Sequence, residues 1–323
     1  MAISVTYTSG VIAANEKYLL KDKLARFISM SAEDAFRLLV ESGFGGGEHV
    51  DGLHELEKLV SFEEKKIDAF IKEYAPSQAE KAYLLSERDF HNAKALLKAK
   101  KTGAEEEKLL APSGLIEIEL LKTCVENGDY SALEETLRQT CEKASELLFE
   151  KNSSPAAVGE VFEKGYYAYL LKVCKYKVFL KKALQNKIDM LNLLAAFRSE
   201  DERLFERKFI EGGKLKKEEI VLAVTDREKG KELFKNNADF FAAVNAERQK
   251  SISIAVAERM LDSYETDLLY QDKYELKAAQ PFLYYVFRRR AECANVRIIF
   301  VCLSAGLSES EIKKRLRSIG KEM

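Results

Sequence analysis

Few side chains in this sequence are of the kinds that enzymes use for catalysis or for binding metal ions. The 323 residues include only three histidines, and two of them, His49 and His54, lie close to acidic residues. Glu48, Asp51 and Glu55 surround this pair, so a metal-dependent helical enzyme is one hypothesis. A metal site needs ligands that converge and a second shell that orients them, and the sequence has no HExxH pair. We therefore expect no metal, no other cofactor and no catalytic residue.

The glycine-rich run at 43–47 (GFGGG) could suggest a phosphate-binding loop. A Walker-type loop ends in Lys followed by Ser or Thr, and it comes directly after a β-strand. The run has neither feature, so we interpret it as a turn that follows a helix. Nucleophilic catalysis is unsupported too, because no Ser or Cys can be placed with a histidine and a carboxylate.

The most cationic triplet of the sequence is Arg288, Arg289 and Arg290. It begins a basic C-terminal region that continues with Arg297, Lys313, Lys314, Arg315, Arg317 and Lys321. One interpretation is a solvated helix face, with cations stabilised near a helix C-terminus. The other is a contact surface for an acidic partner or for anionic lipid headgroups, and the sequence leaves both open. If the three arginines are exposed, we expect charge reversal there to weaken docking more than folding.

The bulk composition indicates a folded protein and argues against several classes of function. Hydrophobic residues make up 46% and charged residues 33%, the balance of a chain with a sizeable core. A net charge of −1 gives no general attraction for nucleic acid. Five cysteines without a CxxC pair, and no recognisable signal peptide, predict reduced thiols in the cytoplasm. The longest apolar run, 298–303, is far too short to cross a bilayer.

Helix signals dominate the chain, which is interrupted by only 4 prolines and 16 glycines. Six capping boxes, each a Ser or Thr with a Glu three residues later, mark predicted helix starts at Ser61, Ser77, Ser131, Ser199, Thr225 and Ser308. We expect one long helix over 155–198, with a proline at its first position, and another over about 238–267. The runs at 251–257 and 296–303 resemble strands, but their flanks lack turn residues, so we interpret both as buried helix.

Three segments of the sequence resemble one another and indicate an internal repeat. Their aligned polar residues are Asn92, Asp189 and Asn295, which lie 97 and 106 positions apart, and each segment precedes a glycine-containing loop and a short helix. We expect these three side chains to hydrogen-bond neighbouring helices in the core between the repeats. The repeat predicts an all-α chain of three helical units arranged about a pseudo-threefold axis. The predicted units are residues 1–110, 111–205 and 206–323.

The same segments resemble the C subunit of the prokaryotic V-type (A-type) ATPases, a family that includes the eukaryotic d subunit. Residues 290–299 (RAECANVRII) are similar to the family's Arg/Glu-x-x-Asn-Ile-Arg-Ile segment, and a Glu-Ile-x-x-x-Leu helix follows at 311–316. Residues 89–97 (DFHNAKALL) are similar to its Asp-x-x-Asn-Ile-Lys-x-Leu-Leu. The sequence departs from the pattern at Ala93, where the family has Ile, and at Asp189, which has no basic residue two positions on.

This resemblance implies a mechanical function and no catalysis. It implies a funnel-like component of the central stalk, which couples the shaft, made of D- and F-type subunits, to the membrane rotor ring. Its place would be peripheral, at the cytoplasmic face of the cell membrane, with a part in ATP-driven H⁺ or Na⁺ transport or in ATP synthesis. The alternative is a general all-helical adaptor or scaffold protein with no link to ATPases, which would show the same helix signals.

Overall fold

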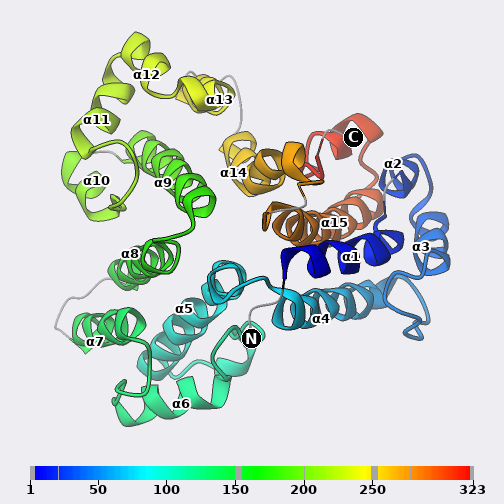
Figure 1. Ribbon diagram of the computed structural model, residues 1–323, viewed down its shortest axis with the longest axis horizontal. Helices are drawn as coiled ribbons and strands as arrows, with labels where there is room; N and C mark the ends of the chain where they lie inside the picture. Colours follow the sequence, from blue (N-terminus) through cyan, green and yellow to red (C-terminus); the bar gives the residue numbers. More distant parts are fainter. Residues whose placement is uncertain are drawn as a thin grey trace. The chain divides into compact units, whose positions relative to one another are not determined.

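The protein is all helical, as predicted from its capping and periodicity. The computed structural model describes residues 4–20, 22–149, 155–199, 201–248, 254–275 and 278–320. Every regular element in these ranges is a helix (Figure 1), and none of these helices has a long enough apolar stretch to span a bilayer. The chain divides into two compact units, one of residues 1–81 with 253–323 and the other of residues 82–252. The three sequence units and their pseudo-threefold axis stay a prediction.

The first unit combines both ends of the chain around one central helix. Its helices are α1 (Val5–Asn15), η1 (Glu16–Tyr18), α2 (Lys23–Ile28), α3 (Ala32–Glu41), η2 (Leu53–Glu55), α4 (Leu56–Tyr74), α14 (Ile254–Leu269), η5 (Tyr270–Asp272), α15 (Gln280–Ser304) and α16 (Glu309–Lys313). Helix α15 contacts α1, α2, α3, α4, α14 and α16 (Figure 1). A helix with neighbours on so many sides buries residues nearly all round, which explains why its sequence shows no single apolar stripe.

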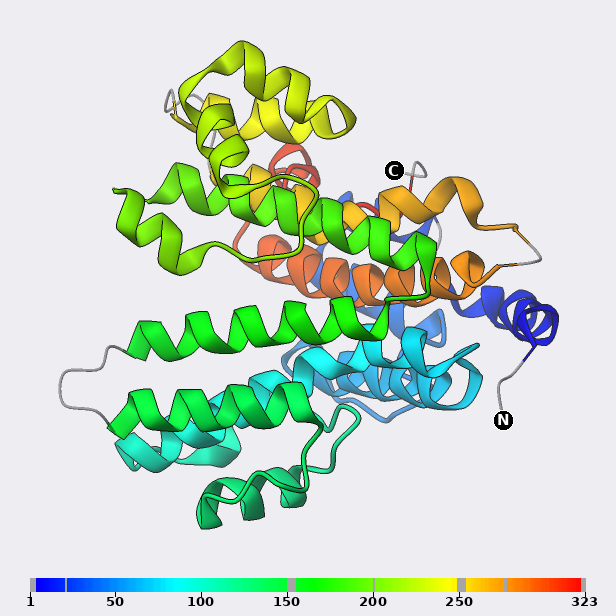
Figure 2. The same ribbon diagram turned by 60° about the vertical axis from the view of Figure 1, so that its left-hand side comes forward.

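The second unit is a succession of helices. It contains α5 (Gln78–Thr102), whose first turn precedes the unit boundary, η3 (Glu106–Lys108), α6 (Ile118–Asn127), α7 (Glu135–Phe149), α8 (Pro155–Val173), α9 (Val178–Arg198), α10 (Glu202–Lys208), α11 (Lys217–Thr225), α12 (Arg227–Leu233), η4 (Lys235–Asn237) and α13 (Ala238–Arg248). Helices α7 and α8 lie side by side, and α8 turns back into α9 (Figure 2). Helix α9 in turn contacts α10, α11 and α13.

Each unit has its own apolar core. In the first, Phe300 of α15 packs against Phe27 of α2 and Phe36 of α3, with ring centroids 6.2 Å apart in both pairs. In the second, one buried cluster joins α5, α6, α7 and α8. This cluster contains five apolar residues that follow Ser131 at helical spacing: Leu133, Leu137, Cys141, Ala144 and Leu148. The 3.6-residue spacing therefore identified the buried face of α7 correctly.

Two of the predicted capping boxes start helices in the structure. The Ser308 hydroxyl accepts the N–H of Glu311 at the start of α16, and the Glu311 carboxylate accepts the N–H of Ser308 at 3.0 Å. Ser77 lies directly before α5, where its hydroxyl bonds the carboxylate of Glu80 and accepts the N–H of Ala79 at 3.2 Å. Both boxes satisfy backbone donors that have no partner inside the helix.

The other four boxes were wrong as helix starts: Ser61, Ser131, Ser199 and Thr225. Ser61 lies inside α4, and the helix that was expected after Ser131 begins at Glu135. Asp201 caps α10 by accepting the N–H of Leu204 at 2.7 Å, and Asp226 caps α12 in the same way. Aspartate is as good an N-cap as serine, so a nearby Asp displaces the predicted start by one or two residues.

The two longest predicted helices are interrupted. The expected helix over 155–198 begins at Pro155 as predicted, but α8 ends at Val173 and α9 begins only at Val178. No glycine or proline marks this turn; Cys174 is fully buried within it, and α8 and α9 fold back onto each other. Tertiary packing, which local sequence does not encode, sets this break. The expected helix over 238–267 is divided between α13 and α14.

The two runs that resembled strands are helical where the structure describes them. Residues 296–303 belong to α15, and residues 254–257 to α14, while 251–253 lie outside the described residues. β-Branched residues suit strands only when a pleated neighbour is present, and here burial among helices decides the conformation.

Candidate functional site

Four buried charged side chains meet on α15 and α4, and we call Glu63, Arg288, Arg289 and Glu292 the α15 ion cluster. Arg288 and Arg289 are only 4% and 3% exposed, and the two glutamates are at least as buried. Arg289 donates through Nη2 to Glu63, and Arg288 donates through Nε to Glu292 Oε1 at 3.3 Å. Charges this far from water are tolerated only when oppositely charged partners face them.

The burial of this cluster corrects one expectation from the sequence. Arg288 and Arg289 do not form a solvated face or an exposed contact surface in this chain, because both point into the first unit. Arg290 alone of the triplet is half-buried. The triplet lies near the middle of α15, not near its C-terminus, so favourable interaction with the helix dipole does not explain it.

The cluster also fastens the N-terminal segment. Arg289 donates through Nη1 to the backbone carbonyl of Tyr18, at the end of η1. The backbone N–H of Leu20 donates to Glu292. The segment between α1 and α2 is therefore attached to α15 by charge-assisted hydrogen bonds, which are stronger than neutral ones.

The C-terminal segment is attached to the same helix. The Tyr284 hydroxyl donates to the carbonyl of Ile319 at 3.0 Å, and Arg317 bonds Asp262 of α14 at 2.7 Å. Arg297 of α15 binds the carboxylates of Glu57 and Glu64 on α4. The basic C-terminal region noticed in the sequence is thus used largely for internal ion pairs.

Burial and charge set the protonation of this region. Burial would lower the pKa of Arg289, but the carboxylates of Glu292 and Glu63 raise it above its usual value. The hydrogen bond from Arg297 lowers the pKa of Glu57. Burial raises the pKa of Tyr285 and of the Cys293 thiol to about 12. Burial also raises the pKa of Glu292, and the charges of Arg289 and Arg288 oppose this shift.

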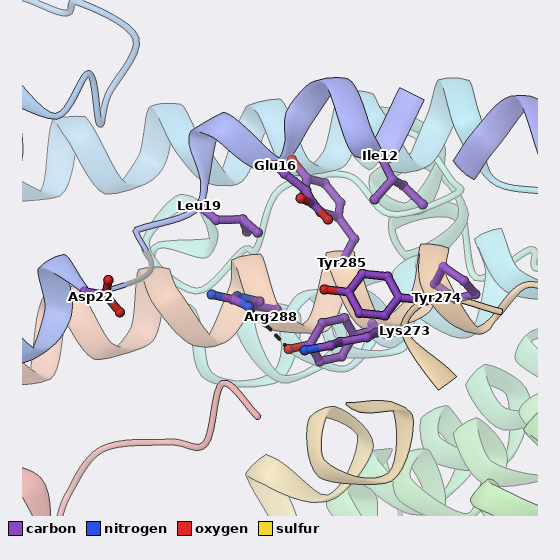
Figure 3. A pocket seen from close by; sticks show the side chains of 10 residues that line it. Ile12, Glu16, Leu19, Asp22, Lys273, Tyr274, Tyr285 and Arg288 are labelled. Atoms are coloured by element: carbon purple, nitrogen blue, oxygen red, sulfur yellow. Dashed lines mark hydrogen bonds between the residues drawn. The ribbon is translucent and has the colours of Figure 1, made fainter. Parts of the chain in front are cut away.

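A pocket of about 280 Å³ lies beside the cluster in the first unit. Glu16 and Asp22 approach it from the N-terminal segment, Lys273 comes from beyond η5, and Arg288 reaches it from α15 (Figure 3). Arg288 donates through Nη1 to the Tyr284 hydroxyl at 3.4 Å, inside the pocket. The lining contains both signs of charge and several tyrosines, but no His, Cys, Ser or Thr.

A second kind of polar site occurs in the second unit, on α5. Asn92 is fully buried; its Nδ2 donates to the carbonyl of Ala111 at 3.1 Å, and its Oδ1 accepts the Ala111 N–H at 2.8 Å. One turn earlier, the Asp89 carboxylate accepts the N–H groups of Leu115 and Ile116 at 3.0 and 3.1 Å. We call this pair of side chains, which binds the backbone of the following loop, a clasp.

The same clasp recurs on α9. Asp189 accepts the N–H groups of Lys214 and Leu215, both at 3.1 Å, and Asn192 bonds both backbone groups of Ile210 at 2.8 Å. Asn192, and not Asp189, therefore makes the bonds that Asn92 makes on α5. In the alignment of the three segments, the second is out of register by three residues.

On α15, Asn295 completes the series. Its Nδ2 donates to the carbonyl of Arg317 at 2.9 Å, and its Oδ1 accepts the Arg317 N–H at 2.8 Å. Glu292 occupies the position of the clasp aspartate, and it binds Leu20 and the arginines instead of the following loop. The three asparagines thus bond the segment that comes after the next short helix, which is η3, α10 or α16, and not neighbouring helices as expected.

Sequence reasoning missed Asp89, Asn192 and the role of Glu292, although a signal was present. The pattern Asp/Glu-x-x-Asn occurs in all three segments, and its asparagines are 100 and 103 positions apart. Each aspartate also requires a glycine in the loop, because a Cβ at Gly114 or Gly213 would collide with its carboxylate. Aligning this pattern, instead of single polar residues, would have found the register.

The remaining sequence candidates do not assemble into a site. His49 lies 3.3 Å from Asp51, and both side chains are largely exposed. Within the described ranges, no three or more His, Cys, Asp and Glu side chains are grouped to hold a metal ion. The glycine run forms a turn after α3 in which the N–H of Gly45 donates to Glu63 at 2.9 Å. Its glycines serve this turn because several have positive φ.

Comparison with known proteins decides the family. The sequence profile of the ATP synthase (C/AC39) subunit family matches residues 9–315. The chain belongs to the ATP synthase (C/AC39) subunit family. It is also 25% identical over 223 residues to the C subunit of the V-type ATP synthase from two strains of Thermus thermophilus, which covers 66% of this chain and 69% of each relative.

The C/AC39 match encloses most of the polar sites described above. It includes both clasps of the second unit, the α15 ion cluster and Asn295. The segments that suggested the resemblance, 89–97 and 290–299, are the parts of α5 and α15 that carry Asn92 and Asn295. In this C/AC39 chain, most residues of these two segments are therefore buried in the helical packing.

Proposed function

We propose that this chain is the non-catalytic C subunit of a prokaryotic V/A-type rotary ATPase, located in the central stalk. It couples the shaft, made of D- and F-type subunits, to the membrane ring that carries H⁺ or Na⁺. Its place is peripheral, at the cytoplasmic face of the membrane. The observation that carries the proposal is the family match over residues 9–315, supported by relatives named as the C subunit of a V-type ATP synthase.

The internal contacts are consistent with a part that transmits force. Each clasp fixes a loop to a long helix through hydrogen bonds that bending would have to break. The α15 ion cluster fixes the N-terminal segment and α4 to the same helix. Close-packed helices deform little under load, so a body held in this way would pass rotation on without absorbing it.

The decisive experiment is reconstitution of the complex with and without this chain. An affinity-tagged chain is expected to capture the shaft subunits and the membrane ring from the host's membranes. Membranes depleted of the chain are expected to hydrolyse ATP without driving ion transport, and adding the chain back is expected to restore transport. Failure to bind either partner would favour the general adaptor. Metal-dependent turnover by the isolated chain would favour the enzyme hypothesis.

Of the three arginines at 288–290, we propose that only Arg290 contacts a partner subunit. Arg290→Glu is expected to weaken capture of the complex more than it lowers the melting temperature, because Arg290 is half-buried and the other two are buried. Arg37→Glu is the matched control, since Arg37 is an exposed arginine on α3 of the same unit. Equal losses of capture and melting temperature in Arg290→Glu would count against this contact.

A further inference from the structure

The turn between α8 and α9 carries the most exposed large hydrophobic side chain among the described residues. Tyr176 is 84% exposed, and Val178, two positions on, is 67% exposed. Figure 2 shows this turn at the end of the α8–α9 pair. We call residues 175–182 the hairpin tip. Isolated exposed apolar residues are common, but an aromatic and an aliphatic side chain exposed together at one turn indicate a contact surface.

The charge around the hairpin tip has one sign. Residues 164–188 contain seven lysines and neither Asp, Glu nor Arg. Within the tip, Lys175, Lys181 and Lys182 are exposed and Lys177 is half-buried. The chain as a whole is nearly neutral, so a run of this length without an acidic residue produces a local positive surface.

Helix stability does not account for the lysines at the start of α9. Lys172, just before the tip, binds Glu134 at 2.7 Å and Glu135 at 3.6 Å, and we therefore leave it out of the tip. Lys181 lies in the first turn of α9, where a cation opposes the helix dipole, and this turn has no acidic residue. This lysine thus costs a little helix stability, which points to a partner outside the chain.

The composition of the tip favours lipid over protein. Lysine is depleted at protein–protein interfaces, whereas arginine is enriched. All the cationic residues of the tip are lysines. Flexible ammonium groups suit the mobile phosphates of a bilayer surface, while tyrosine is a side chain that partitions into the headgroup layer. Lys175 already lies over the Tyr176 ring, 5.2 Å from its centroid, so the aromatic ring and the cation form one unit.

We propose that the hairpin tip docks on an anionic lipid bilayer. Tyr176 and Val178 enter the headgroup layer, and the three exposed lysines of the tip face lipid phosphates. Each exposed lysine contributes about a fivefold gain in affinity for an anionic surface, and the effect is screened by salt. The proposal does not depend on the rotary function, because it concerns the isolated chain and a lipid surface.

Vesicle sedimentation with the full chain tests the proposal. The chain is expected to bind vesicles of phosphatidylglycerol and phosphatidylcholine, and to leave vesicles of phosphatidylcholine alone unbound. Lys181→Gln with Lys182→Gln is expected to reduce the affinity about 25-fold. Tyr176→Ser with Val178→Ser is expected to reduce it about tenfold. Melting temperatures should stay near that of the native chain, because all four side chains are exposed.

Matched controls come from the same unit. Lys229→Gln with Lys231→Gln removes two exposed lysines of α12, and Leu222→Ser removes a side chain of α11 that is 42% exposed. Both controls are expected to bind vesicles like the native chain. The proposal is overturned if the native chain ignores the anionic vesicles, or if control and tip variants bind equally. It is also overturned if the tip is needed only to capture ATPase subunits, which would identify a protein contact and leave the rotary function standing.

Discussion

Asparagine is the residue that lets a long helix bind the loop after it. Its side-chain amide has one acceptor and one donor group, the same set that a backbone peptide offers. Asn92, Asn192 and Asn295 each use both groups on a single loop residue, so two buried backbone groups are satisfied at once. Aspartate could accept the N–H but not donate to the carbonyl, and leucine could do neither.

Asn192→Ala should be strongly destabilising. It leaves both the N–H and the carbonyl of Ile210 without their partner in a buried position, which costs about 2–4 kcal/mol. Asn186→Ala, at a half-buried position on the same helix, should change the free energy of unfolding by less than about 0.5 kcal/mol. Urea denaturation of both variants measures the difference. Similar losses in the two would mean that the clasp contributes little.

Asp189 should make the stability depend on pH. Burial raises its pKa from the usual 3.8 to about 6, and the N–H groups of Leu215 and Lys214 only partly oppose this shift. A raised folded-state pKa means that the folded protein binds the proton more tightly, so this carboxyl favours the folded state at low pH. Its contribution is lost as the pH rises from about 4 through 6, and the loss is on the order of 2–3 kcal/mol.

The comparison that isolates this effect is between the native chain and Asp189→Asn. The native chain should lose stability relative to the variant as the pH rises from about 4 to 7, whatever the other groups of the protein do. Denaturation series at several pH values give both curves. Parallel curves would show that the Asp189 carboxyl has an ordinary pKa, which the two accepted N–H bonds would produce by balancing the effect of burial.

At the scale of whole helices, the buried face can be predicted from sequence for helices with one buried side, but not for α15. The 3.6-residue pattern identified one-sided helices such as α7, because one face of that helix is buried and the other is exposed to water. In α15 nearly every face is buried, charged residues included. Because charged residues usually lie at the surface, the sequence pattern wrongly indicates an exposed face on this helix. Only the position of Glu63, more than two hundred residues away, shows that Arg289 is internal. Such long-range pairing leaves no local signal.

Arg289→Met should weaken the first unit by about 3–5 kcal/mol. The substitution keeps much of the side-chain volume, but it leaves Glu63 and Glu292 buried with less positive charge around them. Lys229→Met, which breaks an exposed pair with Glu232, should cost less than about 1 kcal/mol. Denaturation measures both values.

A second variant separates charge from packing. Adding Glu63→Gln to Arg289→Met removes one of the two carboxylates that lost a partner, so part of the stability should return. If the double variant is less stable by the sum of the two single losses, the residues act through packing and not through their charges.

For the molecule as a whole, the all-α class was predictable and the order of contacts was not. Capping, periodicity and the scarcity of glycine and proline indicate helices throughout. Gly103 and Gly128, which have positive φ, lie directly after the ends of α5 and α6. The first unit, however, is built from both ends of the chain. Local sequence patterns do not predict contacts between residues so far apart in the chain. The sequence analysis interpreted Arg288 and Arg289 as surface residues, whereas Arg289 connects α15 to α4 and to the N-terminal segment.

Two compact units with separate cores should also respond separately to damage. Arg289→Met removes bonds to α4 and to the N-terminal segment, so backbone amide exchange should rise in α1, α4 and α15. Helices α7 and α8 share a core that contains no residue of the first unit, and their exchange should stay at the native rate. Hydrogen exchange followed by mass spectrometry resolves these helices in one experiment, with Asn192→Ala as the reciprocal variant that loosens α9 alone. A uniform rise across all helices would mean that the chain opens as one cooperative body, and a rotor component held rigid by both units together would then be the better description.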